Sequence, residues 1–70
     1  MAETFPERLR RLRRRKGISQ EVLAGLSGLS RSAVFRYEHG NIEPTRPSLI
    51  AMADALGVTL DYLSCRDEEV

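Results

Sequence analysis

Apolar residues recur along the chain at the spacing of an amphipathic α-helix, in short blocks separated by glycine. The first block runs from Thr4 to Gly17 and has its apolar side chains at Phe5, Leu9 and Leu12. Thr4 and Glu7 have the spacing of a capping box, and Pro6 falls in the first turn, where a missing amide proton costs no hydrogen bond. A run of cations before Gly17 suits a helix C-terminus. This block is predicted to be a helix.

Four further blocks repeat this form, each beginning at a Ser or Thr that can cap a helix: Ser19 to Gly28, Ser30 to Gly40, Thr45 to Gly57 and Thr59 to Leu63. The apolar residues of the block at Ser19 are Val22, Leu23 and Leu26, and those of the block at Ser30 are Val34 and Tyr37, with Ala33 beside them. The block at Thr45 has Leu49, Met52, Ala53 and Leu56, and the block at Thr59 has Leu60 and Leu63. No segment has the pattern of a strand. The chain is therefore predicted to be all-α, with five short helices.

A length of 70 residues fits one small domain, whose core we place at about residues 5–63, with an acidic tail at 64–70. The single cysteine, Cys65, cannot form an internal disulfide, and no His and Cys residues have the spacing of metal ligands. We therefore expect no metal and no cofactor. No apolar run approaches about 18 residues and nothing resembles a secretory signal, so we expect a soluble, cytoplasmic protein with no membrane partner.

Charge is nearly balanced over the whole chain, at 11 basic and 10 acidic residues, but it is divided along the chain. Residues 1–40 carry nine basic and four acidic side chains, a net charge of +5, whereas residues 41–70 carry two basic and six acidic ones, a net charge of −4. Such a division indicates one surface for a polyanion and another for something else, although solvated helix faces produce the same pattern.

The second and third blocks are two short helices joined by a turn that contains glycine, which is the arrangement of a helix-turn-helix unit. In that unit the second helix can lie in the major groove of DNA. Ala24 is small where the two helices approach, and Gly28 permits the turn. On the second helix Val34 and Tyr37 face the body of the domain, and one face is left free: Arg31, Ser32, Phe35 and Arg36.

Three stretches resemble one known family: RLRRLRRRKGISQEVLA, GLSRSAVFRYEHG and SLIAMADALGVTLDYL, which together cover roughly residues 5–63. They contain Ser-Gln-x-x-Leu-Ala, Gly-x-Ser, Glu-x-Gly and Ala-Leu-Gly-Val-x-x-Asp-Tyr-Leu, in the order of the lambdoid-repressor type of helix-turn-helix domain, also called the Cro/C1 or XRE family. The resemblance implies a compact five-helix, lambda-repressor-like domain with the helix-turn-helix in its second and third helices. Two positions depart from the family pattern, Gly25 inside a helix and the aromatic Phe35.

Four residues of the third block are candidates for contacts with DNA bases. Arg31 and Arg36 can each donate two hydrogen bonds to guanine O6 and N7, or can be ordinary surface arginines. Ser32 permits close approach and can donate or accept, with weak discrimination. Phe35 is either an apolar contact for a thymine methyl group or an exposed ring packed over its own helix neighbours. His39, near the end of the same helix, lies either beside a phosphate or in solvent.

Other residues are candidates for contacts with the DNA backbone. The resemblance implies that Gln20 links the backbone to the first side chain of the recognition helix, Arg31. Unpaired amides at the start of a helix can also hold phosphates. The expected backbone contacts are Ser19, Gln20, Asn41, Thr45 and Arg46. The resemblance further implies an ion pair between Arg13 and Glu38 that ties the first helix to the end of the recognition helix; the alternative is two unrelated surface charges.

No arrangement of residues indicates catalysis, because the sequence shows no nucleophile beside a base and no glycine-rich phosphate loop. We expect a sequence-specific DNA-binding transcription regulator of a bacterium or phage and, within that class, a repressor without a small-molecule ligand. One such module reads only about four or five base pairs, which favours a homodimer on a near-palindromic operator. The expected dimer surface is Val58, Leu60, Tyr62 and Leu63. The alternative is an antitoxin or protein-binding adaptor that uses the acidic second half.

Overall fold

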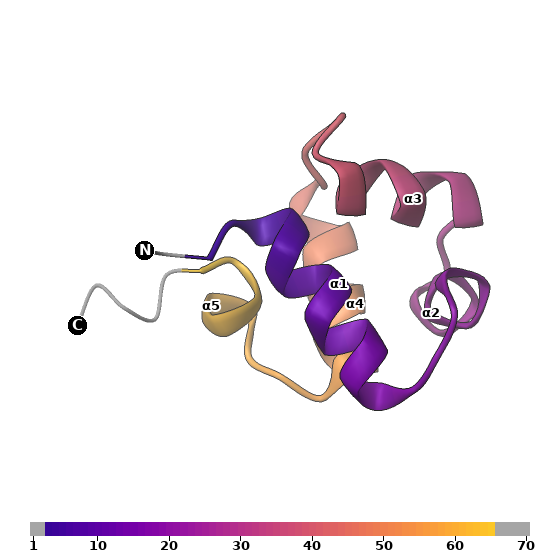
Figure 1. Ribbon diagram of the computed structural model, residues 1–70, viewed down its shortest axis with the longest axis horizontal. Coiled ribbons are helices and arrows are strands. Elements are labelled where there is room, and N and C mark those ends of the chain that lie inside the picture. The colour runs from indigo at the N-terminus through magenta and orange to yellow at the C-terminus, as the bar shows by residue number, and fades with distance from the viewer. Residues whose placement is uncertain (1–2, 66–70) are drawn as a thin grey trace.

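Residues 3–65, which the computed structural model describes, form five α-helices and no strand (Figure 1). The helices are α1 (Phe5–Lys16), α2 (Gln20–Ser27), α3 (Arg31–His39), α4 (Arg46–Leu56) and α5 (Leu60–Leu63). The predicted all-α fold is confirmed, and each helix lies in the block that predicted it. Among the described residues, no helix has the length and apolar character needed to cross a membrane.

Side-chain caps set the start of each helix. The hydroxyl of Thr4 accepts from the amide of Glu7 at 3.4 Å, and the Thr4 amide donates to the Glu7 carboxylate at 3.0 Å, so the predicted capping box is present. The same bond from the amide three residues later is accepted by Ser19, Ser30, Thr45 and Thr59. After α2, Gly28 has a φ of 68°, a left-handed conformation that glycine adopts without steric cost. The turn into α3 therefore depends on a glycine at this position.

The core lies between α1, α2, α3 and α4, and α5 closes it on the side of the molecule away from α2 (Figure 1). Its buried apolar side chains are Leu9, Leu12, Leu23, Ala24, Val34, Tyr37, Met52, Ala53, Leu56 and Leu63. Two apolar residues of the second block lie outside it, since Val22 is 46% exposed and Leu26 is 60% exposed. The short α2 turns a different side toward the core, the side that carries Leu23, Ala24 and Ser27.

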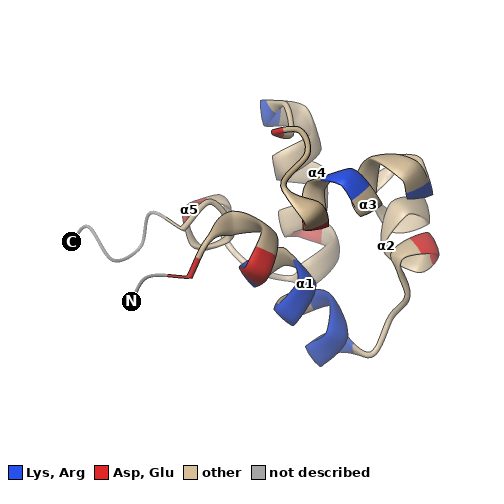
Figure 2. Ribbon diagram, turned by 45° about the horizontal axis from the view of Figure 1, so that its top comes forward, with Lys and Arg blue, Asp and Glu red and all other residues tan. Residues whose placement is uncertain are grey.

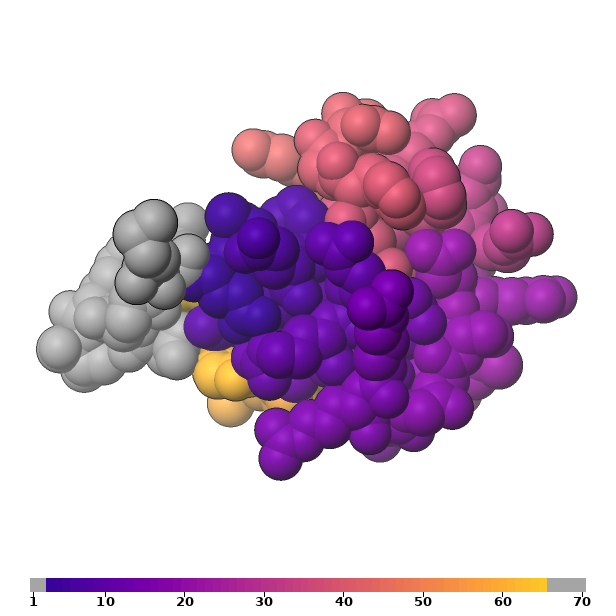
Figure 3. Space-filling model, viewed as in Figure 1, coloured from indigo at the N-terminus to yellow at the C-terminus, as the bar shows by residue number. Residues whose placement is uncertain are grey.

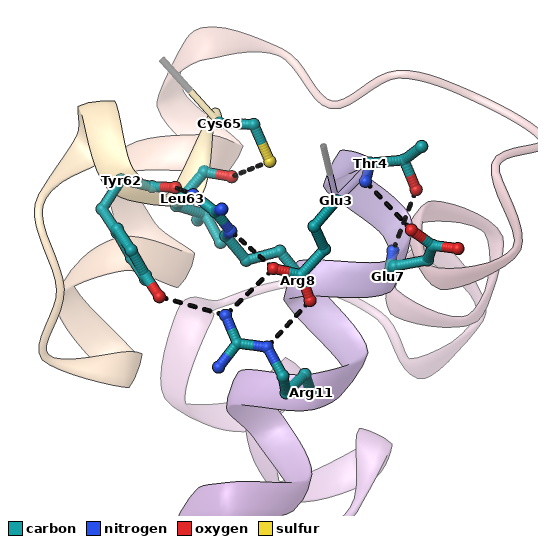
Figure 4. A network of polar contacts seen from close by, with 8 residues as sticks. All are labelled: Glu3, Thr4, Glu7, Arg8, Arg11, Tyr62, Leu63 and Cys65. Carbon is teal, nitrogen blue, oxygen red and sulfur yellow. Dashed lines mark hydrogen bonds and ion pairs between the residues drawn. The ribbon is translucent and has the colours of Figure 1, made fainter. Parts of the chain in front are cut away.

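A polar network joins α5 to the start of α1 (Figure 4). Arg8 donates from Nη1 to the carbonyl oxygen of Tyr62 at 2.7 Å, and its guanidinium carbon lies 4.3 Å from the centre of the Tyr62 ring. Arg11 donates from Nη2 to the Tyr62 hydroxyl at 3.0 Å. Glu3 accepts from Arg11 Nε at 2.8 Å and from Arg8 Nε at 2.9 Å. These bonds, the one from Arg11 first, lower the pKa of the Glu3 carboxyl to about 2. Two cations of α1 are thus used to hold the single turn of α5.

Candidate nucleic-acid interface

The helix predicted to be the recognition helix, α3, has a buried side and an exposed side. Val34 is fully buried, and Tyr37 and Glu38 are 6% and 1% exposed. The other side, which we call the exposed face of α3, consists of Arg31, Ser32, Phe35, Arg36 and His39. These side chains span an arc of about 140° around the helix axis. In the space-filling view the α2–α3 part of the chain lies at one edge of the molecule (Figure 3).

The buried side of α3 is tied to α1 and α2 through Glu38. Arg13 donates from Nε to Glu38 Oε2 at 2.6 Å and from Nη2 to Glu38 Oε1 at 3.1 Å, so the ion pair implied by the resemblance is present in bidentate form. The third nitrogen of Arg13, Nη1, donates to the carbonyl oxygen of Ile18 at 2.9 Å. Because both partners are nearly enclosed, this pair fixes the position of α3 relative to α1.

Gln20, the first residue of α2, makes a different contact from the one expected. Its amide nitrogen donates to Glu38 Oε1 at 3.1 Å, and no hydrogen bond joins it to Arg31 among residues 3–65. A side-chain amide has two N–H groups, so one of them is not used by the bond to Glu38. The sequence contained no local signal for this contact, because Gln20 and Glu38 belong to different helices.

Phe35 has the second geometry considered for it, an exposed ring packed over a neighbour on its own helix, and its contact with a thymine methyl group stays a prediction. Phe35 is 44% exposed, on the exposed face of α3. The same ring stacks on His39, with the ring centroids 4.0 Å apart and the planes inclined by 22°. The role of His39 as a stacking partner was missed in the sequence, although two residues four apart on a helix are neighbours. A shallow hollow beside this pair is lined by Arg31, Ser32 and Phe35.

The residues expected to contact the DNA backbone lie at the starts of α2 and α4 and in the loop between α3 and α4. The hydroxyls of Ser19 and Thr45 cap these helices, since they accept from the amides of Val22 at 3.1 Å and Ser48 at 3.3 Å. Asn41 and Arg46 are exposed. The structure therefore leaves Asn41 and Arg46 accessible, whereas Ser19 and Thr45 offer their hydroxyls only in addition to a structural role.

Basic residues are spread over three helices. Figure 2 shows one group on the second half of α1 and others on α3 and at the start of α4. Within α1, Arg8 and Arg11 bind Glu3. Arg13 binds Glu38. Part of the positive charge of the first half of the chain is thus neutralised internally, while Arg31 and Arg36 on α3 and Arg46 at the start of α4 are exposed.

The residues expected at a dimer surface are less exposed than the sequence indicated. Leu63 is fully buried, because the single turn of α5 directs it into the core, so its expected role in a dimer contact is wrong. Val58 and Tyr62 are partly buried and pack against the core, and Leu60 is partly buried. Beside Leu60 lies a groove of about 420 Å³ whose apolar lining is Phe5, Pro6, Ile42, Pro44, Leu49 and Leu60. In residues 3–65 no group of His, Cys, Asp and Glu side chains is placed to hold a metal ion.

Proteins with related sequences carry the same unit. Residues 9–63 match the family model described as "Helix-turn-helix". Two proteins of Bacillus subtilis are 39% identical to the chain over 59 residues, the SPbeta prophage-derived uncharacterized HTH-type transcriptional regulator YonR and the uncharacterized HTH-type transcriptional regulator YqaE. The matched region covers 84% of this chain but only 55% and 51% of those proteins, so the chain spans about half their length.

Solved structures agree with the sequence comparison. The P22 c2 repressor, crystallised with the synthetic operator 9T, superposes with a TM-score of 0.88 at 32% identity, covering 94% of this chain and 100% of that one. The restriction-modification controller protein C.AhdI of Aeromonas hydrophila superposes with a TM-score of 0.82 at 44% identity, covering 84% of this chain and 89% of that one. Sequence motifs, helix order and overall fold therefore lead to one conclusion. The chain belongs to the XRE-type helix-turn-helix family.

Proposed function

We propose that the chain binds double-stranded DNA in a sequence-specific manner and regulates transcription as a repressor, with α3 in the major groove. The observation that carries this proposal is the division of α3 into two sides. The exposed face of α3 has no part in the core, while the buried side is fixed by Val34, Tyr37 and the Arg13–Glu38 pair. The P22 c2 repressor, with which this chain shares its fold, was crystallised on an operator, and the relatives YonR and YqaE are named transcriptional regulators.

Each residue of the interface has a role in this proposal. Arg31 and Arg36 donate to the major-groove edge of guanine, and Ser32 and Phe35 contact neighbouring bases. The free amide hydrogen of Gln20 donates to a phosphate, while its other one holds Glu38. The remaining backbone contacts come from Ser19, Asn41, Thr45 and Arg46. Backbone contacts fix the orientation of the domain and base contacts supply the sequence preference.

The proposal includes a homodimer on a near-palindromic operator, because one α3 reads too few base pairs to select a site. Its contact would use Val58, Leu60 and Tyr62 with the groove beside Leu60. The family and its relatives indicate DNA binding and not catalysis. Neither the fold nor these relatives favour an antitoxin or adaptor, and that hypothesis is not carried further.

Selection of bound sites from random duplexes, followed by affinity measurements on the selected duplex, tests the proposal. The wild-type chain should enrich a near-palindromic sequence, and log K should fall with log salt with a slope of about −0.9 per phosphate neutralised. Arg31→Ala should lose about 1–3 kcal/mol of preference at one base pair of each half-site. Arg15→Ala, which removes an exposed charge from α1, is the matched control and should keep the preference. Failure to enrich any sequence, or equal loss of preference in both variants, would contradict the proposal.

A further inference from the structure

An aromatic pair lies on the exposed face of α3 and takes no part in the core or in any ion pair that holds the helix. Phe35 and His39 are one turn apart, and their rings stack with centroids 4.0 Å from each other. His39 Nδ1 lies 2.9 Å from the carbonyl oxygen of Phe35, and since a carbonyl oxygen only accepts, Nδ1 donates. The imidazole is therefore held against the backbone of α3, and the Phe35 ring rests on a fixed neighbour.

Phe35 is the member of this pair that lines the hollow at the start of α3. Long side chains of a helix lean toward its N-terminus, so His39 lies over Phe35 and Phe35 lies toward Arg31. The hollow, of about 300 Å³, is lined by a cation, a hydroxyl and an aromatic ring, those of Arg31, Ser32 and Phe35. A ligand that fits it presents hydrogen-bond acceptors on one side and an apolar group on the other.

We propose that Phe35 recognises the C5 methyl group of a pyrimidine in the major groove, and that His39 is the residue that positions Phe35 for this contact. The inference rests on the proposed function, since it requires α3 to lie in the groove. Bases in a duplex are stacked, so a side chain in the groove meets their edges and not their faces. The C5 methyl group is the apolar feature of a thymine edge, and 5-methylcytosine carries the same group.

His39 contributes by restricting the ring of Phe35. An aromatic side chain on a helix has two common χ1 rotamers, and a half-exposed ring without a neighbour exchanges between them. Stacking on a residue one turn away favours the rotamer that the structure shows. A contact with one methyl group depends on the position of the ring, so loss of the stack should weaken methyl recognition even though His39 itself touches no base.

The experiment uses the duplex selected for the proposed function and changes only methyl groups. Each thymine of a half-site is replaced in turn by deoxyuridine, and each cytosine by 5-methyldeoxycytidine. At one thymine, replacement by deoxyuridine should lower the affinity of the wild-type chain about fourfold, because it removes one methyl group from an apolar contact. Replacement at the matching thymine of both half-sites should lower the affinity about 15-fold. A Phe35-dependent gain at 5-methyldeoxycytidine, with no loss at any deoxyuridine, would instead assign the contact to methylated cytosine.

Three variants separate the roles of the two rings. Phe35→Ala should bind the methylated and unmethylated duplexes equally. His39→Ala should at least halve the ratio of the affinity for the methylated duplex to that for the unmethylated duplex. His39→Phe keeps a ring on which Phe35 can stack and should restore this ratio. Ile50→Ala is the matched control, because Ile50 on α4 is 41% exposed against 44% for Phe35, and it should keep the wild-type ratio.

The outcomes that overturn the inference differ from those that overturn the proposed function. If a sequence is enriched but no methyl group affects wild-type affinity, or if Phe35→Ala retains the methyl effect, the inference alone is wrong. If His39→Ala keeps the full ratio, His39 does not position the ring. If no sequence is enriched at all, the proposed function fails and this inference fails with it.

Discussion

Replacing both members of the Arg13–Glu38 pair should cost far less stability than replacing either one alone. Glu38 is 1% exposed and accepts two hydrogen bonds from Arg13 and one from Gln20. Arg13→Met leaves this carboxylate buried with Gln20 as its remaining partner, and Glu38→Leu leaves the Arg13 guanidinium, 11% exposed, with only the carbonyl oxygen of Ile18. A buried charge left without its partner costs about 3–5 kcal/mol, so each single variant should lose that amount.

The double variant Arg13→Met/Glu38→Leu has no charge left to bury. Exchanging a buried ion pair for apolar side chains of similar size is often neutral or stabilising, so we expect its free energy of unfolding to lie within about 1 kcal/mol of wild type. The two single losses would sum to about 6–10 kcal/mol, as large as the entire stability of a domain of this length, about 4–10 kcal/mol. If the two losses added, the double variant would be close to unfolded, whereas we expect it to be folded and more stable than either single variant.

Urea denaturation, followed by circular dichroism, measures the free energy of unfolding of the wild type, the two single variants and the double variant. Arg14→Met is the control, because it makes the same chemical change at an exposed position of α1 and should alter stability by no more than about 0.5 kcal/mol. A double variant that loses the sum of the two single losses would show that the residues act independently, and the reasoning from the bidentate contact would be refuted.

Three further predictions concern stability. Because the folded-state pKa of Glu3 is lowered to about 2, its contribution to the free energy of unfolding is complete above about pH 4.5 and is lost as the pH falls toward 2. The difference in melting temperature between wild type and Glu3→Gln should therefore shrink over that range. A difference that grows in acid would contradict the network. Gly25→Ala should raise the free energy of unfolding in urea by about 1 kcal/mol, since apart from its chain neighbours and its own helix backbone no atom lies within 4 Å of the position its Cβ would take. Gly28→Ala, at a φ of 68°, should lower the same free energy, and equal effects of the two changes would contradict this account. Ser27→Ala should raise the same free energy by about 1 kcal/mol, because the Ser27 hydroxyl is buried without a hydrogen-bond partner in the described part of the chain, and a loss would reveal a partner.

The helices could be predicted because their signals are local. A Ser or Thr cap begins each block and a glycine ends the first four, so these signals lie within one stretch of sequence. The single turn of α5, which no glycine follows, is predicted from its Thr59 cap and from Leu60 and Leu63. Contacts between helices carry no such signal. The Arg13–Glu38 pair came from a resemblance and not from spacing, and the network that joins Arg8 to Tyr62 was not foreseen.

Exposure was the other feature that local pattern could not settle. Leu26 and Leu63 are both leucines at helical spacing, yet Leu26 is 60% exposed and Leu63 is fully buried. The difference arises from which neighbouring helices cover each one, and that depends on the whole arrangement. Phe35 and His39 are an intermediate case, because their spacing of four residues allowed a contact and only the structure showed that the rings stack.

The separation of the two sides of α3 also bears on how such chains diverge. Codons for the exposed face of α3 can change without loss of core packing, because those side chains bury nothing that holds the domain together. Codons for Val34, Tyr37 and Glu38 are constrained by folding, whatever partner the protein has. After a gene duplication, two copies can therefore acquire different partners through a few substitutions on one helix, while natural selection retains the same scaffold in both.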